Sequence, residues 1–129
     1  MAESIIPNTL NGKTGTIITG TNAQSLSVPA KTTRTICSLS LPTGKWIIVG
    51  GHQWSTSFDV ICVGMISSGD TTLAPSSIRY HAEGGGGYCS TIIVDNFSSN
   101  SMTIDLRAYN GDSSARIASD ISLKAIRIA

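Results

Sequence analysis

The chain has 129 residues, enough for one domain with a proper core, and it carries a net charge of +1 with only 13% charged residues. Lys and Arg are scattered singly, which excludes the basic stripe that neutralises nucleic-acid phosphates. The amino terminus lacks a signal-peptide pattern, and no apolar segment approaches the ~20 residues needed to cross a bilayer, so we expect no membrane insertion.

Apolar and polar residues alternate along most of the chain, the pattern of half-buried antiparallel strands. In "TICSLSL", for example, Cys37, Leu39 and Leu41 share one face. The segment "SSARIASD" is too short and too rich in Ser to predict a helix with any force. The alternation and the turn clusters between its runs predict strands at 14–20, 24–28, 33–41, 45–55, 57–67, 77–83, 88–97, 101–109 and 121–128.

Eight or nine short strands without a helix leave three all-β folds: a sandwich, a jelly roll or a small barrel. Three of the strands are apolar on both faces, as in "FDVICVGMI", "KWIIVGG" and "SLKAIRIA". A sandwich normally shows one face of each sheet to water, so such strands need a second cover. A loop is one possible cover, but burial against copies of the same chain is simpler, and a ring of three supplies it.

Three cysteines, Cys37, Cys62 and Cys89, lie inside strand-like runs and form no CxxC motif. We expect buried, reduced thiols; a disulfide between two of them, such as Cys37 with Cys89, would leave the third unpaired.

A run of four glycines, Gly84, Gly85, Gly86 and Gly87, follows "HAE". Neither this run nor "NGKTG" is followed by a helix that would offer its amino end to a phosphate. A linker here would leave two fragments too small to hold a core. A mobile loop at a hairpin tip is the favoured interpretation.

Catalytic groups are few. His81 and Glu83 share one face of a strand, but no third group completes a metal site or an acid–base set. We therefore expect no enzyme activity, no metal and no cofactor.

Several aromatic residues lie at predicted strand ends beside polar loops, where a ring can pack on sugar C–H groups while polar neighbours meet hydroxyls. The alternative is that they are amphipathic residues at a sheet margin. As candidate saccharide-binding residues we select Trp54, Tyr80, His81, Tyr88, Tyr109 and Asp112. We expect Trp54→Ala or Tyr88→Ala to weaken binding without loss of folding.

The stretch "SLSVPAKTTRTICSLSLPTGKWIIVGGHQWS" resembles the opening half of bacteriophage tail-fibre or receptor-binding head domains. The ending "DISLKAIRIA" is similar to the closing strand of the same domains, so the resemblance covers residues from about 24 to 129. It implies a jelly-roll-like antiparallel β-sandwich assembled as a homotrimer, similar to complement-type and tumour-necrosis-factor-type trimers. Residues 1–23 would then lead in from the shaft or shoulder to a single head domain at 24–129.

The same resemblance implies a virion protein of a tail fibre or baseplate, made in the host cytoplasm, that contacts other tail proteins. Its head would attach to a bacterial cell-surface saccharide without enzymatic action. The rival hypothesis is a structural decoration, fibre-cap or assembly protein that makes only protein–protein contacts. A secreted signalling-type trimer is a third option, disfavoured by the missing signal peptide.

Overall fold

A computed structural model describes residues 14–22, 25–55, 60–69, 71–73, 78–81 and 86–129 of the chain. Within these ranges it contains strands and turns and no helix, as expected from the alternation. The strands are β1 (Ile17–Thr19), β2 (Thr21–Asn22), β3 (Ser25–Val28), β4 (Thr32–Leu41), β5 (Gly44–Trp54), β6 (Ile61–Ser68), β7 (Thr71–Thr72), β8 (Ile78–His81), β9 (Gly87–Asn96), β10 (Met102–Asn110) and β11 (Arg116–Arg127).

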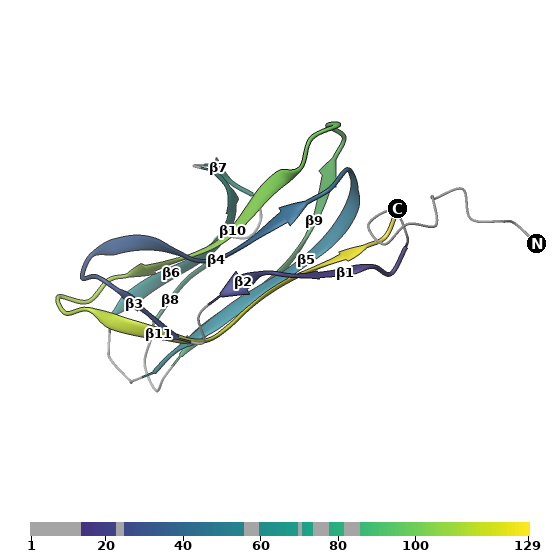
Figure 1. Cartoon of the computed structure of the whole chain (residues 1–129). Coiled ribbons are helices and arrows are strands. Elements are labelled where there is room, and N and C mark those ends of the chain that lie inside the picture. Colours follow the sequence, from purple (N-terminus) through teal and green to yellow (C-terminus); the bar gives the residue numbers. More distant parts are fainter. Residues whose placement is uncertain (1–13, 23–24, 56–59, 70, 74–77, 82–85) are drawn as a thin grey trace, which may run out of the picture.

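The strands form two antiparallel sheets that pack face to face (Figure 1). The first, which we call sheet A, has the order β1-β11-β5-β9, with β3 also paired to β11. The second, sheet B, has the order β2-β4-β10-β6, with β7 and β8 both paired to β6.

The pairing is nested: β11 pairs with β1 and β3, β10 with β4, β9 with β5, and β8 with β6. First strands therefore meet last strands, and the two middle strands meet each other. A long antiparallel ribbon rolled up in this way is a jelly roll. The predicted all-β, jelly-roll-like sandwich is confirmed.

The inward faces of the two sheets form a single core. Its largest fully buried side chain is Trp46, whose indole N–H donates to the Pro42 carbonyl at 3.0 Å. The Arg127 guanidinium lies 5.5 Å from the Trp46 ring centroid, on the neighbouring strand. The "LPTGKW" turn and the "LKAIRI" ending, which carry the family resemblance, are thus side by side in sheet A.

Gly20 marks the point where the chain crosses from sheet A to sheet B. Its N–H donates to the Leu123 carbonyl at 2.7 Å, while β2 begins one residue later beside β4. A Cβ on Gly20 would lie 2.6 Å from the Cys37 sulfur, so only glycine allows this close approach. Residues 17–22 therefore pair with both sheets, although they belong to the expected lead-in. The boundary at residue 23 stays a prediction.

A bulge divides β11. The register with β5 shifts between Ser119 and Ser122, and Asp120 adopts a positive φ of 48°. Before the bulge Ala118 faces the core; after it Ile121 does, so the alternation changes parity. This change of parity explains why the sequence predicts a strand only from 121, although β11 already begins at Arg116, within "SSARIASD".

Candidate functional site

Three of the predicted saccharide-binding residues meet at one end of the sandwich. Trp54 donates its indole N–H to the Tyr80 hydroxyl at 2.8 Å. His52 joins Trp54 to Tyr88: its ring lies edge-on to Trp54 with centroids 5.2 Å apart, and 6.2 Å from the Tyr88 centroid. We call these four residues the aromatic cluster.

The aromatic cluster is part of the core. Trp54 is 3% exposed and Tyr88 4%, so neither offers a ring face to a sugar. Tyr88 packs directly on Gly64 of the opposite sheet, where an added Cβ would overlap its ring. The prediction that Trp54 and Tyr88 form an exposed binding platform is therefore wrong. Aromatic rings beside turns lie at the end of a sheet, but here the second sheet covers that end.

Burial changes the ionisation of this cluster. His52 is 3% exposed; its Nδ1 lies 3.3 Å from the Gln53 carbonyl oxygen, and its Nε2 has no hydrogen-bond partner among the described residues. Burial lowers the pKa of His52, and the contact with Gln53 offsets only part of that effect. Burial likewise raises the pKa of the half-buried Tyr80.

The glycine run lies between strands of different sheets. β8 pairs with β6 in sheet B, whereas β9 pairs with β5 in sheet A, so the expected hairpin is wrong. The Gly86 carbonyl accepts a hydrogen bond from the backbone N–H of Trp54, and Gly87 already belongs to β9. A Cβ on Gly87 would overlap the His52 carbonyl oxygen. Gly87 thus serves close strand packing. Gly84 and Gly85, and the side chain of His81 at the end of β8, lie outside the described residues.

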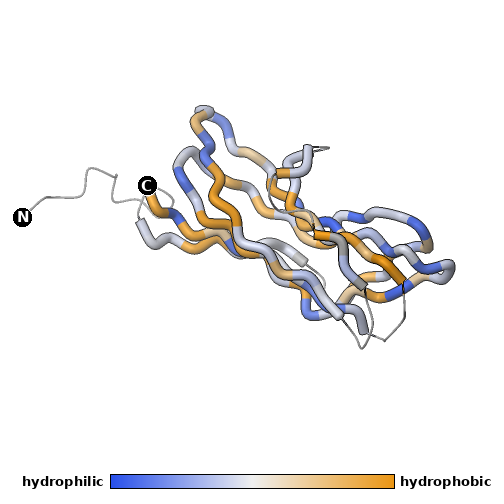
Figure 2. The backbone as a smooth tube through the Cα atoms, turned by 180° about the vertical axis from the view of Figure 1, so that it is seen from behind, coloured by the Kyte–Doolittle hydropathy of each residue, from blue (hydrophilic) through white to orange (hydrophobic). Residues whose placement is uncertain are grey.

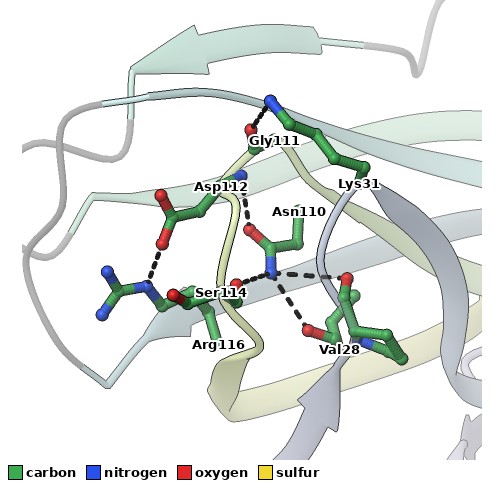
Figure 3. Close-up of polar contacts among 8 residues, drawn as sticks. Val28, Lys31, Asn110, Gly111, Asp112, Ser114 and Arg116 are labelled. Carbon is green, nitrogen blue, oxygen red and sulfur yellow. Dashed lines mark hydrogen bonds and ion pairs between the residues drawn. The ribbon is translucent and has the colours of Figure 1, made fainter.

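Tyr109 and Asp112 lie at the opposite end of β10 from the turn that joins it to β9, and both are half-buried. Asp112 accepts a 2.6 Å hydrogen bond from the Arg116 Nε, which lowers the pKa of its carboxyl (Figure 3). The Asp112 N–H donates to the side-chain oxygen of Asn110. Asp112 thus braces the β10–β11 turn.

Fully buried Asn110 fixes this turn to the one between β3 and β4. Its amide nitrogen donates to the carbonyls of Val28 at 3.0 Å and Ser114 at 2.9 Å. Lys31 adds a bond from its Nζ to the Gly111 carbonyl. Figure 3 shows that these contacts join the β10–β11 turn to the chain between β3 and β4. Of the predicted site residues, Asp112 is therefore structural here, and nothing brings Tyr109 to the aromatic cluster.

An open groove of about 390 Å³ lies where β1 passes into β2 and crosses β4. Five of its seven lining residues carry hydroxyl groups, and none of the predicted site residues lines it. The lining residues are Ile18, Thr19, Thr21, Ser38, Leu39, Ser40 and Thr103. We call it the hydroxyl groove. Next to it, Ser38 donates its hydroxyl to Asp105 at 2.6 Å. Hydroxyls and a carboxylate can exchange hydrogen bonds with a neutral polyhydroxyl ligand.

The outer face of sheet A carries an uninterrupted apolar row. Ile17 pairs with Ile126, Ile126 with Ile47, and Ile47 with Ile93, so four isoleucines from four strands stand side by side. Ile17 is 60% exposed and Ile93 64%, while the two between them are half-buried. We call this set the isoleucine row. Figure 2 shows apolar residues running along the strands, with hydrophilic residues concentrated at turns.

The sequence pointed to part of this row. The strands "KWIIVGG" and "SLKAIRIA" predicted a second apolar face that includes Ile47 and Ile126. Ile93 and Ile17 were missed, although the consecutive apolar residues of "TIIVDNF" and "TGTIITG" carry the same signal. Their alignment depends on register across four strands, which no local pattern reveals.

All three cysteines are free thiols; Cys37 and Cys62 are buried and Cys89 is exposed. Burial raises the pKa of the Cys37 and Cys62 thiols. In the described part of the chain no group of three or more His, Cys, Asp or Glu side chains could hold a metal ion. No helix there is long and apolar enough to cross a membrane.

The buried cluster gives a direct test of core against surface. Tyr88→Ala should lower the free energy of unfolding by about 3–5 kcal/mol, because it removes a buried ring between the sheets. Tyr109→Ala, at a half-buried site on the outer face of sheet B, should cost about 1 kcal/mol. Urea denaturation followed by tryptophan fluorescence measures both. A Tyr88→Ala protein as stable as the wild type would restore this residue as a surface group.

His52 should make folding sensitive to mild acid. Because its pKa is lowered in the folded state, the unfolded chain binds the extra proton below an ordinary pKa of about 6.5. Above about pH 6.5 His52 is neutral in both states and does not lower the free energy of unfolding. As the pH falls toward 5, protonation of the unfolded chain lowers the free energy of unfolding by at most about 1.4 kcal/mol per pH unit. The slope of unfolding free energy between pH 7 and 5 should flatten in His52→Gln. An unchanged slope would rule out His52 as its source.

Comparisons with known proteins leave the family open. No family model matches the chain, and no curated protein matches its sequence. Among solved structures, the chain is similar to the crystal structure of the infectious bursal disease virus VP2 subviral particle, at 15% sequence identity and a TM-score of 0.45. The match covers 88% of this chain and 36% of the VP2 chain, so this chain spans about a third of that protein's length. The jelly-roll assignment rests on the strand order of the chain itself.

Proposed function

We propose that this protein is a non-enzymatic virion component, a homotrimeric head or cap of a tail fibre or baseplate, that acts through surface contacts. Its resemblance to tail-fibre head domains motivates the virion assignment. The nested strand order supports it, because the two motifs that carry the resemblance lie on paired strands, β5 and β11.

The isoleucine row carries the proposal. An isolated exposed isoleucine is ordinary, but a contiguous apolar row across four strands marks an association surface. The adjoining row of the same face holds Val49 between Lys124 and Thr91, so the apolar area continues along β5. Sheet A needs a cover, and three copies arranged in a ring give each one the same contact.

Attachment to a bacterial cell-surface saccharide is the second candidate function, and the hydroxyl groove favours it. Its open shape and its lining of hydroxyl groups beside apolar surface suit a neutral sugar better than a charged ligand. Three such grooves in one trimer, and several trimers on a particle, would turn weak single sites into firm attachment. This proposal places the saccharide away from the aromatic cluster.

A structural cap or assembly protein is the alternative to a receptor-binding head. Both would use the isoleucine row for association. They differ in whether the hydroxyl groove binds a sugar.

A single charged substitution should disrupt association through the isoleucine row. Ile17→Lys places an ammonium group in the isoleucine row and should cost each contact about 2 kcal/mol or more of apolar burial. We expect the mass measured by sedimentation velocity to fall by a factor of three. Ile61→Lys is the matched control, because Ile61 is 42% exposed on the outer face of sheet B. Equal masses for the two variants would refute association through this face.

Saccharide binding can be tested by filling the groove. On an array of bacterial surface glycans, the wild type should bind a saccharide that Ser40→Trp binds at least tenfold more weakly. Ser113→Trp, in the exposed β10–β11 turn, is the control and should bind like the wild type. A wild-type protein that binds no saccharide would favour the cap, and equal binding by both variants would place the sugar elsewhere.

A further inference from the structure

Strand β9 forms one edge of sheet A. Its ten residues pair with β5 on one side, and no described strand lies on its other side. The other edge strands of the described sheets, by contrast, have two to four residues. β9 is therefore the longest strand in the described part of the chain that has no strand partner along one whole side, since β4 pairs with β2 at Cys37 and Ser38.

The direction of the β9 backbone groups follows from its neighbour. Lys45 donates its N–H to the Ala129 carbonyl at 2.9 Å, and its carbonyl accepts from the Ile128 N–H at 2.9 Å. Both groups thus point away from β9, so Asp95, the register partner of Lys45, turns its own N–H and C=O to the free edge. Antiparallel alternation gives the free edge the backbone groups of Gly87, Cys89, Thr91, Ile93 and Asp95.

This edge lacks the features that prevent strands from pairing with other chains. Natural edges are blunted by lysine, proline, bulges or short length. β9 contains no lysine and no proline, and its register with β5 is unbroken over ten residue pairs. Its single charge, Asp95, has its carboxylate 3.9 Å from the Lys45 ammonium of the same chain. The 64% exposed Ile93 stands directly beside the open backbone groups.

We propose that β9 pairs antiparallel with β9 of a second copy, about a two-fold axis at Ile92, so that two A sheets become one continuous sheet. In this register Cys89 pairs with Asp95 of the second copy, and Thr91 with Ile93. Four of the five outward residues of each chain then meet one another, and Gly87 at the start of the strand is left over. Four such pairs that each exchange two hydrogen bonds satisfy about eight backbone groups per chain. An axis between two residues would pair these outward groups with groups that already bond to β5. An axis at Thr91 also matches outward groups, so the choice of Ile92 rests on the side chains.

The side chains agree with this register. On the outer face, β-branched Thr91 lies beside Ile93 of the second copy, a favourable cross-strand pair. On the inner face, Ile92 meets its own copy, and both are apolar. The two Asp95 carboxylates lie opposite Cys89 residues, so like charges never face each other. These features favour a second copy of this chain over a strand from another protein.

The pairing does not depend on the proposed trimer or on saccharide binding. It predicts even-numbered assemblies: two chains if the isoleucine row stays uncovered, and six if trimers also form. The variant Ile17→Lys leaves β9 pairing intact, so failure of the two proposals can be told apart.

Thr91→Pro tests the edge directly. Its N–H faces the free edge, so proline leaves the bonds to β5 in place and removes a donor needed only between copies. The mass by light scattering should fall to half the wild-type value, whereas Thr91→Val should keep the wild-type mass. A monomeric wild type, or a Thr91→Pro protein with undiminished mass, would overturn the proposal.

Cross-linking tests the register and decides the matter if Thr91→Pro fails to fold. In a Cys89→Ser background, Ile92→Cys should form a disulfide-linked dimer on oxidation, because residues facing each other across the axis lie within disulfide reach. Val94→Cys in the same background should stay uncrosslinked, because its copy lies about 14 Å away along the strand. Equal cross-linking of the two variants, or none at residue 92, would contradict the pairing.

Discussion

Pairing between β5 and β11 joins the middle of the chain to its last residues, and the other features of the molecule depend on it. It brings Arg127 over Trp46, closes the nested order of strands, and places β11 between β5 and the first strands. It also brings Ile47 and Ile126 together on the outer face. The contact that completes the core therefore also forms the middle of the isoleucine row.

Much of the fold was predictable, because alternation is a local property. The predicted strands at 33–41, 45–55 and 101–109 agree with β4, β5 and β10 to within one residue at each end. Non-local features were not predictable in the same way. The bulge at Asp120 hides the first half of β11 by reversing its alternation. The change of sheet between β8 and β9 makes a glycine-rich crossing look like a hairpin, since nothing in the flanking strands records which neighbour each will pair with.

The candidate site shows the same division. Three of the six residues proposed from the sequence as a saccharide site, Trp54, Tyr80 and Tyr88, do meet, but they meet at the core. An aromatic ring next to a turn has the same local sequence whether the second sheet covers it or not. The surfaces that remain, the isoleucine row, the hydroxyl groove and the β9 edge, are each assembled from register or crossing, and each involves residues with ordinary local context. Of these three surfaces, the sequence indicated only part of the isoleucine row, through the strands that are apolar on both faces.

These surfaces are the basis of our proposal that the protein assembles with copies of itself. One face of sheet A carries an isoleucine on each of four strands, and the β9 edge of the same sheet has no strand partner among the described residues. Light scattering of the fully reduced wild type over a wide range of concentration tests this account most directly. We predict a mass of at least two 13.5 kDa chains. A well-folded monomer at every concentration would contradict it, and the apolar face and open edge would then need a cover from elsewhere.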